Sequence, residues 1–329
     1  MGRYRWVPVH VMRNDKEMLI PPTIEPPLTQ PDDLRIGHLL GMSEEAPSVI
    51  LIGFPSDQGV LLNGGRPGAA EGPDAIRRAF YAMTPGSAGA HGLFPKVKDL
   101  GNVQVSGDVV ADLEALADVV SAYLGPETIV AILGGGHETA YGHFLGYVSS
   151  NVAPRIVNWD AHADVRPPRD GKPTSGSSFY LALEHETHPT PDYTVVGLLP
   201  HSVAPAHVDY LHDHPGRHLW REEIDGDAID EVYAGSTDPT MVSFDLDAVD
   251  QAYAPGVSAP AAGGLDPTRW LHGAYAAGVS PAVWSIDICE LNPIYDIDNQ
   301  TARLAALTLW HFLSGCAARL GVKRFLRSR

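Results

Sequence analysis

Three short segments of the sequence carry side chains of the kind that bind divalent metal ions. In each segment an apolar run ends and the polar side chains follow directly, as Ile156-Val157 precedes Asp160. Carboxylates and imidazoles without thiolates suit Mn²⁺ better than a structural zinc ion. The candidate ligands are His137, Asp160, His162, Asp164, Asp245 and Asp247.

The segment that holds Asp160, His162 and Asp164 cannot bind one ion while it stays extended. At ~3.3 Å per residue, its two carboxylates would lie about 13 Å apart. We therefore expect the chain to curl as it leaves its strand, at the carboxyl end of a sheet, where open α/β sheets place their sites. Four carboxylates held close oppose one another's ionisation. Two divalent cations would balance their charge, so the sequence predicts a two-ion site.

Phosphate-binding loops and zinc-protease helices fit these segments less well than a two-ion site. The glycine run 134–136 is not followed by the Lys-Ser or Lys-Thr of a phosphate-binding loop. His137 does not begin a zinc-protease helix, because the next histidine, His143, lies six positions on rather than four. We interpret the glycines as a tight turn that points His137 into the site. A polar loop would account for one motif, but not for three at three predicted strand ends.

Strand and helix signals alternate from Ser48 onward, which predicts a mainly parallel sheet with helices on both faces. We expect one domain over residues 48–329, because the candidate ligands come from widely separated strands. Residues 1–47 are expected to form an arm, since paired prolines interrupt regular structure there. The histidine-rich segment 185–218 is expected to be largely a solvated connection. Strands are expected near residues 49–54, 129–133, 155–157, 193–196, 241–245 and 282–287, and helices near 73–80, 111–124, 139–148, 223–233, 267–278 and 300–313.

The composition is that of an ordinary soluble protein, with 329 residues, 44% of them apolar and 19% charged. A net charge of −17 argues against nonspecific binding of nucleic acid, although local arginines would still admit an anionic substrate. Cys289 and Cys316 make neither a disulfide framework nor a metal-type spacing. The sequence shows neither an apolar core of signal-peptide length nor a run of ~18 apolar residues. We therefore expect a cytoplasmic protein without membrane contact.

The motifs Gly-Gly-Gly-His-Glu, Asp-Ala-His-Ala-Asp and Ser-Phe-Asp-Leu-Asp-Ala-Val-Asp together resemble the arginase, or ureohydrolase, superfamily, in order over residues 49–313. The resemblance implies a three-layer α/β/α fold with a parallel sheet of about eight strands, two Mn²⁺ ions and usually a homo-oligomer. By this resemblance, one ion would be bound by His137, Asp160, Asp164 and Asp245, and the other by Asp160, His162, Asp245 and Asp247. Asp160 and Asp245 would bridge both ions.

Within the superfamily, residues 35–41, 63–73, 254–260 and 295–298 resemble the formimidoylglutamases, which split N-formimidoyl-L-glutamate into L-glutamate and formamide. Arginases carry a proton-transfer histidine just beyond a Ser-Gly pair, and Phe179 stands at that place here. This difference weakens an arginase or agmatinase interpretation. The alternatives are another ureohydrolase, of the agmatinase or guanidino-acid type, and a non-catalytic metal-binding member of the fold.

The resemblance assigns Glu290 to holding the cationic amidinium part of the substrate. A water bridging two ions loses a proton near neutral pH, and we expect the resulting hydroxide to attack the formimidoyl carbon. Asp164 is expected to carry the proton to the departing nitrogen. We expect arginine to bind the two carboxylates of this small-molecule substrate, because a planar guanidinium group can bind both oxygens of one carboxylate. Arg166 and Arg66 are the candidates, and Ser175 would add a neutral hydrogen bond.

Overall fold

The structure is a computed structural model of the chain, and it describes residues 18–29, 32–40, 46–86 and 94–327. Within these residues, a nine-stranded sheet has the order β1-β3-β2-β4-β9-β8-β5-β6-β7. Its strands all run parallel except β1 (Leu19–Ile20), which pairs antiparallel with β3 (Val97–Val103) at one edge. The predicted parallel sheet of about eight strands is thus confirmed, with one antiparallel strand added.

The inner strands are buried on both faces, which explains their nearly continuous apolar sequences. In β2 and β4, for example, every residue is buried. Strands β8 and β9, which carry site residues, lie side by side with Ser243 opposite Asp287. The other strands are β2 (Val49–Gly53), β4 (Ile129–Leu133), β5 (Arg155–Trp159), β6 (Tyr193–Leu198), β7 (Gly216–Trp220), β8 (Thr240–Asp245) and β9 (Val283–Cys289).

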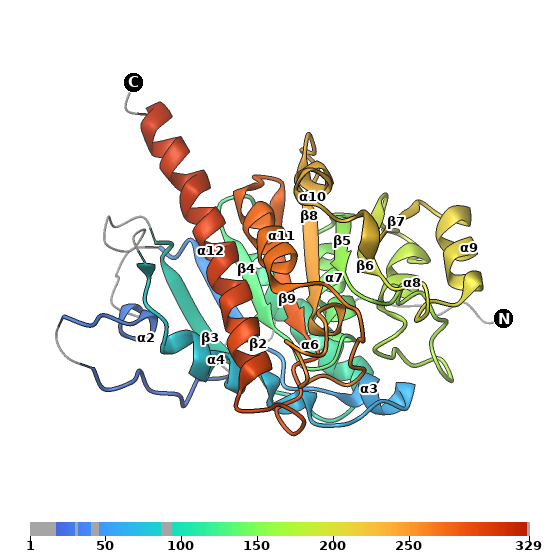
Figure 1. Cartoon of the computed structure of the whole chain (residues 1–329), viewed down its shortest axis with the longest axis horizontal. Helices are drawn as coiled ribbons and strands as arrows, with labels where there is room; N and C mark the ends of the chain where they lie inside the picture. Colours follow the sequence, from blue (N-terminus) through green and yellow to red (C-terminus); the bar gives the residue numbers. More distant parts are fainter. Residues whose placement is uncertain (1–17, 30–31, 41–45, 87–93, 328–329) are drawn as a thin grey trace.

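Helices cover both faces of the sheet, which confirms the three-layer α/β/α arrangement (Figure 1). Alternate strand residues point to opposite layers, so Leu51 packs in one core and Ile52 in the other. One layer contains α6 (Val109–Tyr123), α7 (Thr139–Ser149), α8 (Ser178–Leu183) and α9 (Pro205–Asp213). The other contains α2 (Ile36–Leu39), α4 (Gly72–Tyr81), α10 (Gly226–Tyr233), α11 (Pro267–Val279) and α12 (Gln300–Arg327). Of the helices described, none is both long and apolar enough to cross a membrane.

Short helices complete the chain, and three regions depart from expectation. The short helices are α3 (Gln58–Asn63), η1 (Ala69–Glu71), η2 (Arg221–Glu223) and η3 (Leu246–Ala248). The histidine-rich segment contains α9 and β7, so its prediction as a solvated connection is wrong. Helix α12 continues to Arg327 rather than ending near residue 313. Strand β3 was not expected, because it carries polar residues. Its Asp99 is paired with the fully buried Arg77 at 2.8 Å, and this partner lets a polar strand lie inside the fold.

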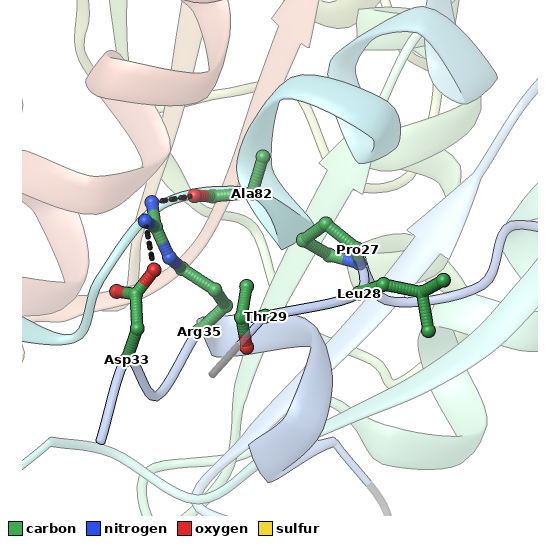
Figure 2. A pocket seen from close by; sticks show the side chains of 6 residues that line it. All are labelled: Pro27, Leu28, Thr29, Asp33, Arg35 and Ala82. Atoms are coloured by element: carbon green, nitrogen blue, oxygen red, sulfur yellow. Dashed lines mark hydrogen bonds and ion pairs between the residues drawn. The ribbon is translucent and has the colours of Figure 1, made fainter. Parts of the chain in front are cut away.

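The described part of the expected arm, residues 1–47, lies against the rest of the protein. Strand β1 extends the sheet, and Ile36 on α2 is fully buried. Figure 2 shows Arg35 donating a hydrogen bond to the Ala82 carbonyl (2.8 Å) and pairing with Asp33 (2.5 Å). Ala82 follows the last turn of α4, whose carbonyls lack helical partners, so Arg35 satisfies one of them. Residues 1–17, 30–31 and 41–45 of this segment lie outside the described part.

Candidate metal centre

Four neighbouring strands, β4, β9, β8 and β5, bring the predicted polar side chains to one edge of the sheet. His137 lies in the loop after β4, Asp160 follows β5, Asp245 ends β8 and Glu290 follows β9. Because the four strands are parallel, their carboxyl ends meet at the same edge. The fold therefore assembles one site from segments that are far apart in the sequence.

Two groups of possible metal ligands occur among the described residues, and each has ligand atoms within 4.8 Å of one another. The first group contains His137, Asp160, Asp164 and Asp245, and the second contains Asp160, His162 and Asp247. Asp160 belongs to both groups. Its Oδ2 lies 3.4 Å from Nδ1 of His137, and its Oδ1 lies 3.4 Å from Nδ1 of His162. This carboxylate thus turns one oxygen to each group, as a bridging ligand must.

The remaining contacts are shorter. Nδ1 of His137 lies 2.8 Å from Asp164 and 2.9 Å from Asp245, and Nδ1 of His162 lies 3.1 Å from Asp247. Among the groups that the described residues form, Asp245 belongs to the first alone, whereas we expected it in both. The geometry therefore favours Asp160 as the bridge more strongly than Asp245.

The same kind of turn folds both acidic segments. Oδ1 of Asp160 accepts the backbone N–H of His162 at 2.7 Å, and Oδ1 of Asp245 accepts that of Asp247 at 2.8 Å. Aspartate favours such turns because its short side chain reaches the backbone two residues on. Asp164 then adopts a left-handed conformation with φ of 47°. The chain therefore curls after Trp159, as expected, and the ligands of each segment converge.

The glycine run 134–136 leads into the predicted turn, which the N–H of Thr139 closes on the Gly136 carbonyl at 3.0 Å, and the structure shows a further reason for glycine. None of these three residues has a positive φ, so left-handed freedom is not what the position requires. A Cβ added to Gly135 would lie 1.9 Å from the carbonyl oxygen of Ser56. The carbonyl of Gly135 also accepts the N–H of Glu290 at 2.8 Å. Close approach of backbones thus explains the glycine, and it holds His137 beside the end of β9.

Negative charge dominates the site and favours bound cations. Burial, together with neighbouring carboxylates, raises the pKa of Asp247 to about 6 and that of Asp245 well above its usual value. The negative charge of Asp247 raises the pKa of His162 to about 12. Within the described part of the protein, the buried Oδ1 of Asp247 has no hydrogen-bond partner. Four carboxylates, two imidazoles and this unused oxygen fit a pair of divalent ions.

Glu290 adjoins the two groups and has one unsatisfied oxygen. Its Oε1 accepts the backbone N–H of His137 at 2.8 Å, whereas its buried Oε2 has no partner among the residues described. Its φ of 70° is unusual for a residue other than glycine and typical of functional sites. Burial raises its pKa to about 8, and the nearby charges of Asp247 and Glu138 add to this. A cationic group of a ligand would donate a hydrogen bond to the free oxygen of Glu290 and would balance the negative charge around it.

Arg166 and Ser175 lie beside each other next to this site. Asn63 donates a hydrogen bond to Oγ of Ser175 at 3.1 Å. A Cβ added to Gly176 would lie 3.1 Å from Nδ2 of Asn63 and 3.2 Å from Cδ of Arg166, so both of these side chains lie against the glycine that follows Ser175. The Arg166 side chain is exposed, and the described residues offer its guanidinium no hydrogen bond or ion pair. Its donors are thus available to a ligand.

Arg66 is more constrained than expected. Its Nε donates to the carbonyl of Ser258 at 3.0 Å, and its Nη2 donates to that of Val257. The guanidinium carbon also lies 3.9 Å from the centre of the Tyr295 ring. The structure therefore places Arg66 as a link between two distant loops, with part of its guanidinium committed to the protein.

Several supporting residues were missed from the sequence. Asn158 donates to Oδ2 of Asp160 at 3.0 Å, and alternation along β5 could have found it, because it lies two residues earlier on the same strand face. Tyr193 donates to the carbonyl of Ala163 at 2.8 Å and had no signal in the sequence. Phe179 stacks on Tyr193 (4.7 Å) and packs edge-on against His137 (5.4 Å). It supplies apolar support where arginases have a histidine.

His207 on α9 was also missed, because it lies among many other histidines. Burial and the positive charge of nearby Arg166 lower its pKa, and the charges of Asp164 and His162 reach it as well. This places a titratable side chain near Arg166 and the candidate ligands Asp164 and His162.

Comparisons with known proteins support one family. A family model described as the arginase family matches residues 47–315. A formimidoylglutamase of Rhodococcus opacus (strain B4) is 37% identical over 316 residues, covering 88% of this chain and 95% of the relative. That of Staphylococcus carnosus (strain TM300) is 36% identical over 276 residues, covering 80% and 85%. Two similar solved structures are the Trypanosoma cruzi formiminoglutamase with Mn²⁺ (28% identity, TM-score 0.78, covering 88% and 100%) and the Bacillus subtilis formimidoylglutamase (27%, 0.79, 88% and 94%).

Proposed function

This chain belongs to the arginase family and is a hydrolase that acts on amidines, and from this premise we propose that it cleaves N-formimidoyl-L-glutamate to L-glutamate and formamide. The observation that carries the proposal is the position of Glu290. Its unsatisfied carboxylate oxygen lies next to two ligand groups that share Asp160. A carboxylate suited to an amidinium thus adjoins groups that are suited to metal ions.

We propose that the cofactor is a pair of Mn²⁺ ions. His137, Asp160, Asp164 and Asp245 would hold one, and Asp160, His162, Asp245 and Asp247 the other. When bound, such ions lower the pKa of water and supply a nucleophile near neutral pH. Oxygen-rich ligation with two imidazoles supports Mn²⁺ as the metal.

Glu290 would position the carbon that is attacked. The formimidoyl group is planar and cationic when protonated, and Oε2 of Glu290 is the free acceptor for its N–H groups. The same carboxylate is fixed by the backbone N–H of His137, so the amidine would be held at a set distance from the ligand groups. Fixed placement of this kind contributes a large part of catalysis.

Asp164 would move the proton that the reaction requires. As the bond between the formimidoyl carbon and the glutamate nitrogen breaks, that nitrogen must gain a proton to leave as an amine. Phe179 has no proton to give. Asp164 lies within the first ligand group and is held by the turn at its own left-handed backbone. General acid–base help of this kind is worth ~10²- to 10⁴-fold.

Arg166 would bind a carboxylate of the glutamate part. It is exposed beside Ser175, which would contribute a neutral hydrogen bond. Arg66 keeps a supporting role in the proposed pocket, because its links to Val257 and Ser258 fasten a loop. We also propose that the enzyme works as a homo-oligomer in the cytoplasm.

A substrate panel tests the proposal. Purified protein loaded with Mn²⁺ would be given formimidoylglutamate, agmatine, arginine and short guanidino acids, with formamide and urea measured separately. We expect formamide and glutamate from the first compound and little urea from the others. A preference for agmatine or a guanidino acid would instead assign the chain to that kind of ureohydrolase. No turnover of any compound with both ions bound would indicate a non-catalytic member.

A further inference from the structure

A chain of buried hydrogen bonds begins at His137 and leads away from the candidate metal centre. Nε2 of His137 lies 2.9 Å from Oγ of Ser243, which donates to Oδ1 of Asp287 at 2.5 Å. The other oxygen of Asp287 lies 2.7 Å from Nδ1 of His143. Ser243, Asp287 and His143 are fully buried, and water therefore does not compete for these bonds.

The path of hydrogen bonds continues from His143 toward the C-terminal end of helix α7. Nε2 of His143 lies 2.5 Å from Oγ of Ser285, which lies 2.6 Å from the hydroxyl of Tyr147. Tyr147 also donates to the backbone carbonyl of Thr240 at 3.2 Å. A polar path thus links a possible metal ligand to the backbone of β8.

Regular spacing in three elements builds this path. His143 and Tyr147 are four residues apart on α7, so they share one helix face. Ser285 and Asp287 alternate along β9 and point to the same side of the sheet. Ser243 lies directly opposite Asp287 on the neighbouring strand β8. The contact between α7 and these strands is therefore polar, although the surrounding layer is apolar.

The direction of each hydrogen bond fixes the protonation of His137. A carboxylate only accepts, so the hydroxyl of Ser243 must donate to Asp287. That hydroxyl can then only accept from His137, whose proton must be on Nε2. Nδ1 is the nitrogen that faces Asp164 and Asp245, so a metal ion bound among these groups would take the lone pair of Nδ1 while Nε2 keeps its proton.

We infer that Asp287 and His143 are positioning residues that act through Ser243 to hold the ring of His137 for metal binding. The inference rests on the proposed metal site. His143 donates to the second oxygen of Asp287 and so fixes the carboxylate that orients Ser243. The sequence singled out His143 only as a histidine with the wrong spacing for a zinc protease, and this path gives it a role.

Metal affinity of the purified protein tests the inference. Mn²⁺ binding to metal-stripped wild type, Ser243→Ala, Asp287→Asn and His143→Gln would be measured by titration calorimetry. We expect Ser243→Ala and Asp287→Asn to weaken one of the two ions by ~10- to 100-fold, because partners of ligating histidines have effects of this size. The affinity for the ion that His162 would bind should change little. His143→Gln should act in the same direction but less strongly, since it is one bond further away.

Two further variants separate positioning from simple stability. Ser243→Thr keeps a hydroxyl and should restore most of the affinity that Ser243→Ala loses. Thr308→Val is a matched control, because Thr308 accepts a buried hydrogen bond from Trp270 at 2.7 Å between α11 and α12. It should lower the melting temperature and leave Mn²⁺ affinity unchanged.

The possible outcomes are distinct. If Ser243→Ala and Asp287→Asn lower the melting temperature as Thr308→Val does but bind both ions with wild-type affinity, the path only holds α7 to the sheet and the inference is wrong. If Asp287→Asn does not fold, Ser243→Ala decides alone, since it removes only one hydroxyl. If the wild type itself fails to bind two ions, the proposed metal site is wrong, and this inference is then wrong as well.

Discussion

Asp160 turns its two oxygens to two different histidines, and this geometry sets the consequence of losing it. We expect Asp160→Ala to abolish binding of both Mn²⁺ ions, whereas His162→Ala should mainly weaken one. The number of ions per protomer after desalting, measured by elemental analysis, checks this. Asp112→Asn is the control, because Asp112 is a buried carboxylate that binds the backbone of residues 106–107 instead. Two tightly bound ions in Asp160→Ala would disprove the bridge.

Asp245 provides a second comparison at the same site. It would bridge both ions by resemblance to the arginase family, but the structure groups it with the first set of ligands. Loss of both ions in Asp245→Ala would support two bridging carboxylates. Loss of one would leave Asp160 as the bridge and restrict Asp245 to a single ion.

Glu290→Gln tests the proposed amidinium contact. Glutamine has nearly the same shape but lacks the negative charge, so we expect both Mn²⁺ ions to stay bound while kcat/KM falls by ~10²-fold or more. Steady-state kinetics and metal analysis on the same sample measure this. Glu184→Gln is a suitable control, since Glu184 pairs with His214 at the surface. Full activity in Glu290→Gln would exclude the assigned role.

Arg166→Ala tests the proposed carboxylate contact. Hydrogen bonds to charged groups contribute ~1.5–3 kcal/mol, so KM for formimidoylglutamate should rise by ~10- to 100-fold while metal content and melting temperature stay unchanged. Arg169→Ala is the matched control, because Arg169 lies three residues on, is exposed, and donates to the carbonyl of Leu62 at 2.7 Å. An unchanged KM in Arg166→Ala would remove this residue from the binding set.

The convergence of the six candidate ligands was predictable, because each follows an apolar run within a few residues and such spacing is visible in the sequence. The side chains that position these candidate ligands were harder to predict from the sequence. Arg66 reaches Val257 across 191 positions of sequence, and Tyr193 reaches Ala163 from another strand. Contacts of this kind depend on how the strands are ordered in the sheet. The strand order cannot be predicted from the residue types near a motif.

At the level of secondary structure, the loop between β4 and α7 depends on a backbone contact. Gly135→Ala would place a Cβ 1.9 Å from the Ser56 carbonyl, which forces that loop away from Ser56. We expect a loss of about 3 kcal/mol in unfolding free energy, the upper part of the usual range for overpacking, together with weaker Mn²⁺ binding. Chemical denaturation and metal titration measure the two effects. Gly125→Ala, at a site with no atom within 4 Å, should be nearly neutral.

Apart from the end of α12, the core strands and helices that the sequence predicted match the structure nearly to their ends, because their apolar patterns are long or continuous. Strand β7 was missed, since its sequence Gly-Arg-His-Leu-Trp mixes polar and apolar residues at the edge of the sheet. Helix α9 was missed for a similar reason: Leu211 is its one buried residue. Strands and helices at the edge of the fold are stabilised by contacts with their neighbours rather than by an apolar pattern of their own. Their sequences therefore give only a weak signal.

At the scale of the whole molecule, the proposed ions should contribute to stability. A ligand that binds only the folded state stabilises it by ~2.7 kcal/mol at one hundred times its Kd. We therefore expect a chelator to lower the melting temperature by several degrees and added Mn²⁺ to restore it, as followed by calorimetry. Asp160→Ala should show neither response. A melting temperature that ignores both chelator and Mn²⁺ in the wild type would contradict a tightly bound metal pair.

The order of strands in the sheet has a consequence for how the protein is made. Among the described strands, β8 and β9 come last in the chain, yet they lie between β4 and β5 in the middle of the sheet. Until residues 240–289 have been made and have left the ribosome, the emerging chain can form only two separate half-sheets, and Asp245, Asp247 and Glu290 cannot join the site. Closing the gap requires contacts between distant parts of the chain, which are slow to form. Capture of both metal ions must therefore wait until β8 and β9 have taken their places in the sheet.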